Sequence, residues 1–381
     1  MSSGVTRSAA VLPVTELRAA FFSDAAPDRN GVGTYYRDLC EHLQARVERA
    51  ELFCPEQSDD GWRDPICFPL PGDATQKICI PNPRQLRRRF GALQPQAVVV
   101  ATPAPYGLIG LRLARKHGAR VISGFHTHFE KLTSLYWKDK PRTGRLFHWY
   151  LENCHRLLFR YSDTVLANSE EMIEIANSIG ARNTELMGTT IARPFIDTPV
   201  TALRDNIGVV TFAGRLAAEK NLESVIAAAQ ALPDIQFRIV GTGPQLDLVE
   251  EAAARITNLE YAGWVARAQM PEIIDATDML VLPSRVESFG TIALEAMTRS
   301  RTVLVSRECG ITQWQDLSPG LFRIAEGEDL AAAIKRVAGL DPALRTLKAR
   351  RGREAACNLN EWTVNHWLDV LSRGALAGNH G

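Results

Sequence analysis

The stretch that most restricts how this chain can fold runs over residues 279–297 and reads MLVLPSRVESFGTIALEAM. Its first four residues form an apolar run that is typical of a buried parallel strand, and Pro283 ends that run. A loop then leads to Gly290 and Thr291, where an apolar helix is expected to begin. A buried strand, a loop and a buried helix in this order predict one βα unit of a parallel α/β sheet.

Two carboxylates stand out in this stretch. Glu295 falls in the second turn of the expected helix among apolar residues, and Glu287 lies in the loop before it. Backbone N–H groups at a helix start bind anions, and carboxylates accept hydrogen bonds from sugar hydroxyls. The pattern suits a ligand that carries hydroxyls and a phosphate. The alternative is that Glu295 pairs with an arginine and Glu287 is a solvated loop residue.

A second segment, FAGRLAAEKN over residues 212–221, also follows an apolar run and precedes a helix. Arg215 and Lys220 are placed there to meet a phosphate from the other side of the ligand. The two segments, with Glu287 and Glu295 separated by seven residues, resemble the retaining nucleotide-sugar glycosyltransferases of family 4, the group 1 transferases. The FHTHF segment at 125–129 looks most like members that glycosylate lipids.

This resemblance implies the α/β GT-B fold, in which two Rossmann-like domains face each other across a cleft. The expected N-terminal, acceptor-binding domain covers residues 1–190, and a linker covers residues 189–206. The nucleotide-sugar domain covers 207–355, and residues 356–381 hold a C-terminal helix that packs back on the first domain. Within that last segment the helix is expected at residues 361–372.

The resemblance also assigns roles. Arg215, Lys220 and the helix start would neutralise the donor diphosphate, Glu295 would hold the ribose diol, and Glu287 a sugar hydroxyl. His126, at the end of a strand, would contact the donor sugar and the reaction centre, while the role of the nearby His128 stays open. No metal or other cofactor and no protein nucleophile are implied. Further substrate-binding positions are Gly31, Gly33, Gly241, Gly243, Trp264, Val265, Ser288, Phe289, Gly290 and Thr291.

Other elements follow from periodicity and from glycine and proline positions. A strand at 16–22, a glycine loop at 23–33 and a helix at 34–45 form the first unit, and position 36 is tyrosine, so the loop is no GxGxxG fingerprint. Residues 55–83 contain many prolines and predict irregular loop. Further expected strands and helices alternate along the chain, with strands at 97–102, 120–124, 163–167, 207–212, 235–240, 259–264, 279–282 and 302–306.

Composition indicates the class of protein, its compartment and a charged surface segment. Apolar content of 45% and charged content of 23% are those of a globular protein, and seven scattered cysteines without metal spacing indicate free thiols in a reducing cytoplasm. Residues 77–160 hold 16 Lys and Arg against 3 Asp and Glu, although the whole chain has a net charge of +1. This basic segment predicts peripheral contact with an anionic membrane surface, and a solvated basic face is the alternative.

The function expected from these features is transfer of a hexose from a nucleoside-diphosphate sugar to a membrane lipid such as diacylglycerol. UDP-hexose is the favoured donor and GDP-mannose the next. A soluble sugar or polysaccharide acceptor is the first alternative, and a nucleotide-sugar epimerase or a non-catalytic sugar-nucleotide binder is the second. No nucleic-acid-binding motif accompanies the basic segment, and the oligomeric state stays open.

Overall fold

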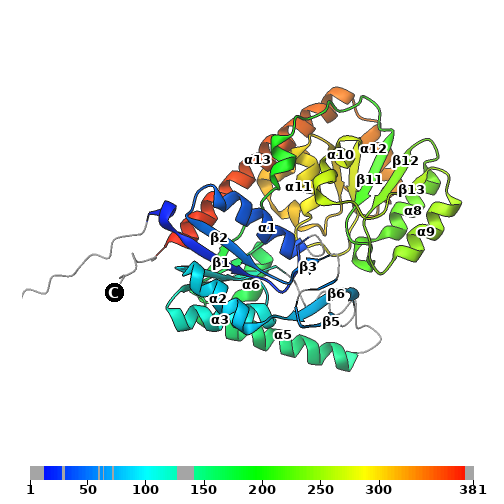
Figure 1. Ribbon diagram of the computed structural model, residues 1–381. Helices are drawn as coiled ribbons and strands as arrows, with labels where there is room; N and C mark the ends of the chain where they lie inside the picture. The colour runs from blue at the N-terminus through cyan, green and yellow to red at the C-terminus, as the bar shows by residue number, and fades with distance from the viewer. Residues whose placement is uncertain are drawn as a thin grey trace, which may run out of the picture.

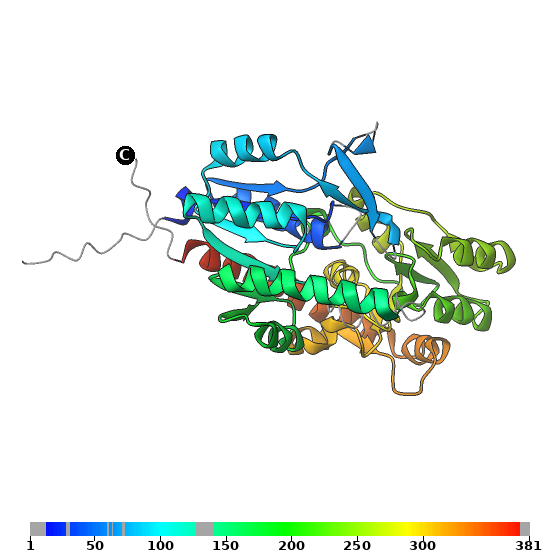
Figure 2. The same cartoon turned by 90° about the horizontal axis from the view of Figure 1, so that it is seen from below.

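The computed structural model describes residues 13–27, 31–58, 61–62, 64–70, 73–126 and 141–373. These residues form two α/β domains, each built on a six-stranded parallel sheet covered by helices (Figure 1 and Figure 2). The prediction of two Rossmann-like domains is therefore confirmed. Within the described residues, every helix is too short or too polar to cross a bilayer.

The N-terminal sheet is buried on both faces. Neighbouring residues of strand β1, which lies next to the edge strand, enter opposite cores: Phe21 packs with helix α1 and the end of the last helix, and Phe22 packs with α2 and α3. This two-sided burial explains why its strands read as continuous apolar runs. In sheet order the strands are β10 (Thr184–Leu186), β9 (Thr164–Ala167), β8 (Arg120–Phe125), β7 (Ala97–Val100), β1 (Arg18–Phe22) and β2 (Arg49–Phe53). The helices are η1 (Val14–Glu16), α1 (Gly31–Gln44), α2 (Pro83–Leu93), α3 (Pro105–His117), α5 (Pro141–Tyr161) and α6 (Glu170–Ile179).

The C-terminal sheet has the strand order of a doubly wound nucleotide-binding domain, with its two halves meeting between β11 and β14. In sheet order its strands are β13 (Leu259–Tyr261), β12 (Gln236–Val240), β11 (Val209–Ala213), β14 (Met279–Leu282), β15 (Thr302–Val305) and β16 (Leu321–Arg323). The longer helices are α8 (Leu222–Ala231), α9 (Leu246–Arg255), α10 (Met270–Asp275), α11 (Thr291–Thr298) and α12 (Leu330–Ala338). Short 3-10 helices are η2 (Ala218–Lys220), η3 (Arg267–Gln269), η4 (Gly310–Gln313) and η5 (Gln315–Gly320).

The segment between the domains is held by a buried arginine. It contains α7 (Arg193–Asp197), and the fully buried Arg299 donates hydrogen bonds to the carbonyls of Thr198 and Pro199, both at 2.6 Å. Arg299 also pairs with Asp275. A guanidinium has five donors, so one side chain can fasten several carbonyls of an irregular segment at once.

The last helix connects the two domains. α13 (Pro342–Ser372) is longer than the predicted helix at 361–372 and runs unbroken through residue 355, where the sequence suggests a boundary. Its first half packs on the C-terminal domain, and near its end Trp367 enters the N-terminal core. There the Trp367 indole donates to the Tyr35 hydroxyl at 2.7 Å. Figure 1 shows this helix crossing from one domain to the other.

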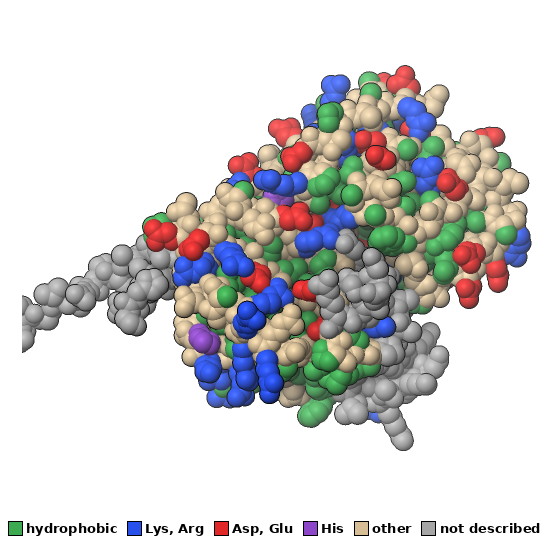
Figure 3. Space-filling view, viewed as in Figure 1, with side chains coloured by type: hydrophobic (Ala, Val, Ile, Leu, Met, Phe, Trp, Pro, Cys, Tyr) green, Lys and Arg blue, Asp and Glu red, His purple; other side chains and the backbone are tan. Residues whose placement is uncertain are grey.

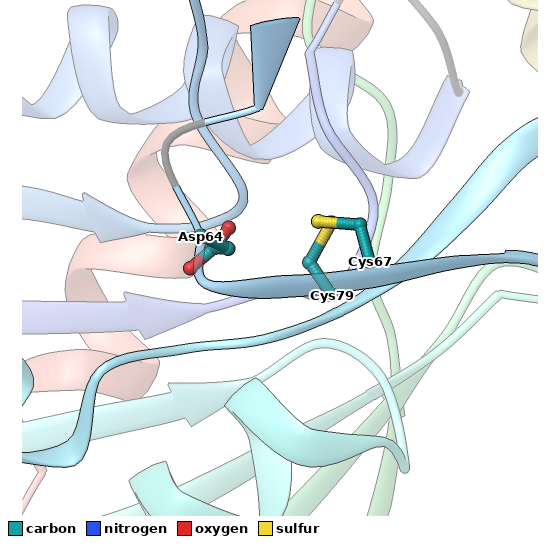
Figure 4. Close-up of side chains that lie close together, drawn as sticks. All are labelled: Asp64, Cys67 and Cys79. Atoms are coloured by element: carbon teal, nitrogen blue, oxygen red, sulfur yellow. A yellow bond between two sulfur atoms is a disulfide. The ribbon is translucent and has the colours of Figure 1, made fainter.

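Two expectations about residues 55–83 are wrong. Instead of irregular loop, this region forms two hairpins, β3 (Gln57–Ser58) with β4 (Gly61–Trp62) and β5 (Ile66–Leu70) with β6 (Asp73–Ile80). Cys67 and Cys79 face each other across the second hairpin and form a disulfide (Figure 4), so these two are not free thiols. The other five cysteines are free.

Candidate functional site

The candidate site lies where the two halves of the C-terminal sheet diverge. In open parallel sheets, ligands bind beyond the carboxyl ends of the strands at this switch point. The loop after β11 carries Arg215 and Lys220, and the loop after β14 carries Glu287 and leads into α11. Although 71 residues separate Arg215 from Glu287 in the chain, the sheet order places the two loops side by side.

The two loops are joined by a buried ion pair. The Nζ of Lys220 lies 2.5 Å from Oε2 of Glu287, and each side chain is 16% exposed. Burial by itself would lower the pKa of Lys220, but the charge and hydrogen bond of Glu287 raise it, so the ammonium stays charged. The interpretation of Glu287 as a solvated loop residue is therefore wrong. Its backbone is also held, because the Gly310 N–H donates to the Glu287 carbonyl at 2.9 Å.

Arg215 lies beside this pair on the same loop. Its Nη1 is 3.1 Å from Oε1 of Glu219, which is 8% exposed. The loop bends at Gly214, whose φ is +153°, and again at Asn221, whose φ is +56°. These turns place two cationic side chains within one short loop, and the nearby carboxylates Glu219 and Glu287 hold them in position.

Gly241 and Gly243 make close approaches to the protein's own backbone. A Cβ at Gly241 would lie 1.9 Å from the Gly214 carbonyl oxygen, and one at Gly243 would lie 2.4 Å from that of Leu216. Their lack of a side chain lets the loop after β12 pack against the loop that carries Arg215. This packing of two loops explains why both positions need glycine, and it does so without any bound ligand.

The start of α11 presents main-chain amides to the same region. Its N-cap is Gly290, with φ +98°, and no side chain caps the helix. Phe289 is buried against Trp314, with ring centroids 6.1 Å apart, whereas Ser288 is half-buried and Thr291 is exposed. The first-turn N–H groups of a helix have no intrahelical acceptor, so this uncapped start can receive an anion.

Glu295 occupies the position expected from the sequence but has a partner. Its Oε1 lies 2.7 Å from Nη2 of Arg267, and its side chain is 3% exposed. The same Arg267 nitrogen lies 2.5 Å from Oδ2 of Asp38, on α1 of the other domain. Burial raises the pKa of both carboxyl groups, and Arg267 opposes that rise. The alternative in which Glu295 pairs with an arginine is thus the arrangement in the structure.

The loop that leads to Arg267 has an exposed aromatic side chain. Trp264 is 53% exposed and Val265 is half-buried. The loop is fixed at Gly263, where φ is +74° and the carbonyl accepts a hydrogen bond from the Gly241 N–H at 2.8 Å. The backbone of this loop is therefore attached to the next loop of the same sheet edge.

On the N-terminal domain, His126 follows β8, as predicted. Its Nε2 lies 2.8 Å from the Tyr36 hydroxyl, and its ring packs edge-on against the rings of Tyr35 and Tyr36. Burial lowers the pKa of His126 to about 3, so the imidazole is neutral at pH 7. His128 lies outside the described residues.

Gly31 and Gly33, also on the N-terminal domain, lie in a helix, whereas the sequence predicts a loop at residues 23–33. Gly31 and Gly33 form the first turn of α1, which begins three residues before the predicted start. A Cβ at Gly33 would lie 2.3 Å from the Ala25 carbonyl oxygen, whereas a Cβ at Gly31 would have nothing within 4 Å. Gly33 is therefore fixed by packing of the preceding loop, whereas no described residue lies where a Cβ at Gly31 would be.

The residues missed by sequence reasoning are the partners of these groups. Tyr36 orients His126, and Asp38 with Arg267 holds Glu295. Tyr36 and Asp38 both lie on α1, and the only signal in the sequence is that they are polar residues among apolar ones. The partner of Tyr36, His126, is 90 residues away in the chain, and the partner of Asp38, Arg267, is 229 residues away. Such distant pairings cannot be read from spacing.

Within the described residues, one group of side chains lies close enough to hold a metal ion. It comprises Asp64, Cys67 and Cys79 (Figure 4). The two sulfurs are bonded to each other, and the Tyr106 hydroxyl donates to Asp64 Oδ1 at 2.8 Å. The group belongs to the hairpin of the N-terminal domain and shares no residue with the switch-point loops.

Comparisons with known proteins agree with this geometry. Residues 29–186 match the family model described as Glycosyltransferase Family 4, and residues 208–339 match the one described as Glycosyl transferases group 1. The two matches follow each other and cover both domains. The chain belongs to this glycosyltransferase family.

Two relatives of this glycosyltransferase come from Streptomyces kanamyceticus. It is 34% identical over 153 residues to an alpha-D-kanosaminyltransferase and 32% identical over 168 residues to a 2-deoxystreptamine glucosyltransferase. These matches cover 37% and 42% of this chain, and 39% and 42% of the relatives. The chain thus spans about two fifths of the length of these curated relatives.

A solved structure confirms the fold. HepE from Anabaena, crystallised with UDP-glucose, superposes with a TM-score of 0.66 over 94% of this chain and 100% of that one, at 15% sequence identity. The GT-B fold expected from the sequence is therefore confirmed. At this identity the likeness concerns the fold alone.

Proposed function

We propose that this glycosyltransferase transfers a hexose from a nucleoside-diphosphate sugar, with UDP as the preferred nucleotide, to a hydroxyl group of a membrane lipid such as diacylglycerol. The observation that carries the donor proposal is the set of groups at the switch point: Lys220 and Arg215 lie on one loop, and Lys220 pairs with Glu287 in the neighbouring loop that leads to the uncapped start of α11. A pyrophosphate carries negative charge that two cations and main-chain amides can balance.

In this proposal the reaction is a displacement at the anomeric carbon with retained configuration. The bond from that carbon to the β-phosphate oxygen breaks, and a bond to the acceptor oxygen forms on the same face. The acceptor proton passes to the leaving phosphate. Arg215 and Lys220 stabilise the charge that develops on that phosphate, as preorganised electrostatics does.

The remaining roles are proposed from the resemblance to the family. Glu287 binds a sugar hydroxyl while Lys220 holds its carboxylate in place. The neutral His126 contacts the sugar from the other domain, oriented by Tyr36. Glu295 binds the ribose diol, and the loop with Trp264 and Val265 borders the nucleobase. We propose a metal-independent reaction, since these groups balance the diphosphate charge.

The membrane acceptor is supported by the surface of the N-terminal domain. The outer face of α5 exposes Trp149, Tyr150 and Leu157 beside Arg145, Arg156 and Arg160. Figure 3 shows further Lys and Arg side chains over α2 and α3, where Arg84, Arg87, Arg88, Arg112, Arg115 and Lys116 are exposed. Each cation near an anionic leaflet contributes about 1 kcal/mol, and exposed aromatic residues enter the interface.

A soluble acceptor is the second candidate. The observation in its favour is the match to a 2-deoxystreptamine glucosyltransferase, whose name gives a small water-soluble acceptor. A single assay separates the two: UDP-glucose is incubated with the protein and either diacylglycerol in anionic vesicles or 2-deoxystreptamine, and the products are identified by mass spectrometry. The anomeric coupling constant of the product, measured by NMR, tests retention.

Vesicle binding tests the surface directly. We expect the protein to sediment with phosphatidylglycerol vesicles at low salt and to be released by high salt, because surface charges are screened. A variant with Trp149→Ser and Leu157→Ser should bind less, whereas Leu344→Ser, a control exposed to a similar extent on α13, should bind as the wild type does. If the wild type does not sediment with such vesicles at low salt, the proposal of a lipid acceptor is refuted.

A further inference from the structure

Three side chains that can bind a metal ion meet at the second hairpin of the N-terminal domain. Cys67 of β5 lies directly opposite Cys79 of β6, and Asp64 precedes β5. One carboxylate oxygen and the two sulfurs all lie within 4.8 Å of one another (Figure 4). The register of the hairpin brings them together, which explains why their spacing along the chain shows no metal motif.

The two sulfurs lie on the inner face of this hairpin. Ile66, Phe68 and Ile80, which are sequence neighbours of the cysteines, are 56%, 43% and 38% exposed, whereas Cys79 is fully buried. Because successive side chains of a strand point to opposite faces, the cysteine side chains point away from the exposed apolar face. The ligand atoms are therefore built into the hairpin and do not lie on its open surface.

Asp64 has one carboxylate oxygen that lacks a partner. Its Oδ1 accepts a hydrogen bond from the hydroxyl of Tyr106, on α3, at 2.8 Å. Its Oδ2 is buried and has no hydrogen-bond partner in the part of the chain that the structure describes. A buried acceptor without a partner costs free energy, because nothing replaces the water that it has lost. A cation beside the two sulfurs would supply the missing contact.

We propose that the reduced protein binds one zinc ion through Asp64, Cys67 and Cys79. A dithiol reductant first transfers two electrons and two protons to the disulfide between the two cysteines and itself becomes a disulfide. Zinc then displaces the two thiol protons. The two thiolates and Oδ2 of Asp64 fill three of its four tetrahedral positions, and a water fills the fourth. Thiolate sulfur selects zinc over magnesium and calcium, which prefer oxygen ligands.

The hairpin can accept the ion without movement of its strands. Zinc–sulfur bonds of about 2.3 Å at a tetrahedral angle separate the two sulfurs by about 3.8 Å. The Cα atoms of Cys67 and Cys79 are 4.2 Å apart, so rotation about the Cα–Cβ bonds is enough to reach this separation. The disulfide and the ion exclude each other, because both use the same sulfurs. The ion would join the hairpin to α3 through Asp64 and Tyr106, away from the switch-point loops.

Zinc binding by the full chain tests the proposal. The protein is reduced with dithiothreitol and freed of reductant without air, and zinc is then titrated in competition with a chromophoric chelator. We expect one zinc ion per reduced chain and none in the oxidised chain. Cys67→Ser and Cys79→Ser should abolish binding. Asp64→Asn should weaken it at least about tenfold, since even an outer partner of a metal ligand contributes that much. The control Cys357→Ser, which removes a free, half-buried thiol on α13, should still bind one ion.

Cobalt(II) gives a second measurement that needs no variant. In a tetrahedral thiolate site it absorbs strongly in the visible and near ultraviolet, so these bands should appear with the reduced wild type and not with the oxidised protein. Zinc should also raise the melting temperature of the reduced protein alone. A reduced wild type that binds no zinc, or a double variant Cys67→Ser with Cys79→Ser that binds it as tightly as the wild type, overturns the proposal. These measurements involve no glycosyl transfer, so their outcome is independent of the proposed function.

Discussion

Replacing Lys220 by alanine separates what the buried pair does for stability from what it does for catalysis. Lys220 and Glu287 are 2.5 Å apart and each only 16% exposed, so the change leaves a carboxylate with little solvent around it and removes a cation from the switch point. Lys220→Arg is the conservative control, because it keeps the charge.

The two effects have different expected sizes. Breaking a fully buried pair costs about 3–5 kcal/mol, and the partial exposure here reduces this to about 2–3 kcal/mol. For a domain of this size, each kcal/mol lowers the melting temperature by about 2–4 °C. Loss of a preorganised charge that faces a leaving group lowers kcat by about 10²–10³.

Differential scanning calorimetry and a UDP-glucose transfer assay measure the two effects. The double variant Lys220→Met with Glu287→Gln should recover most of the lost stability, since neither residue is left charged, yet remain as slow as Lys220→Ala. Lys220→Arg should recover part of kcat. A folded Lys220→Ala protein with wild-type kcat would show that Lys220 does not stabilise the leaving phosphate.

Three further predictions concern other parts of the molecule. Burial lowers the pKa of His126 to about 3 and that of His155 to about 4, below the unfolded value of about 6.5, so the unfolded state binds more protons between these values. These two histidines therefore lower the free energy of unfolding as the pH drops from 6.5 to 4, whereas the buried Asp24, whose pKa is raised to about 6, acts in the opposite direction. Measured in urea, the stability of the wild type relative to His155→Gln should fall over this range. Arg299→Ala should lower the melting temperature of the C-terminal domain by more than any exposed arginine substitution, because Arg299 is fully buried and its loss leaves the carbonyls of Thr198 and Pro199 without their donor, at about 1–3 kcal/mol for each acceptor left unpaired. Thiol titration of the unfolded protein should find five reactive cysteines before reduction and seven after it, and seven at both stages would exclude the Cys67–Cys79 disulfide.

The sequence predicted the alternation of strands and helices because burial on both faces leaves a strong local signal. Runs such as Ala97–Val100 and Met279–Leu282 are apolar throughout and end at loops. The hairpins at residues 57–80 were missed because prolines obscured the short strands, and because the pairing of Cys67 with Cys79 depends on register.

The sequence predicted individual residues of the site but not the ion pairs that connect them. Arg215, Lys220, Glu287 and the start of α11 lie together because the strand order makes β11 and β14 neighbours. The pairing of Lys220 with Glu287 spans 67 residues, and that of Arg267 with Asp38 spans 229. Contacts of this kind depend on how loops and domains meet, and no local pattern encodes them.

We expect the switch point of the C-terminal domain to hold the pyrophosphate of the donor. A crystal structure of the protein with UDP tests it most directly. We expect phosphate oxygens to lie about 3 Å from the Lys220 ammonium, the Arg215 guanidinium and the first amides of α11. UDP bound elsewhere, with these groups still turned toward protein carboxylates alone, would contradict it.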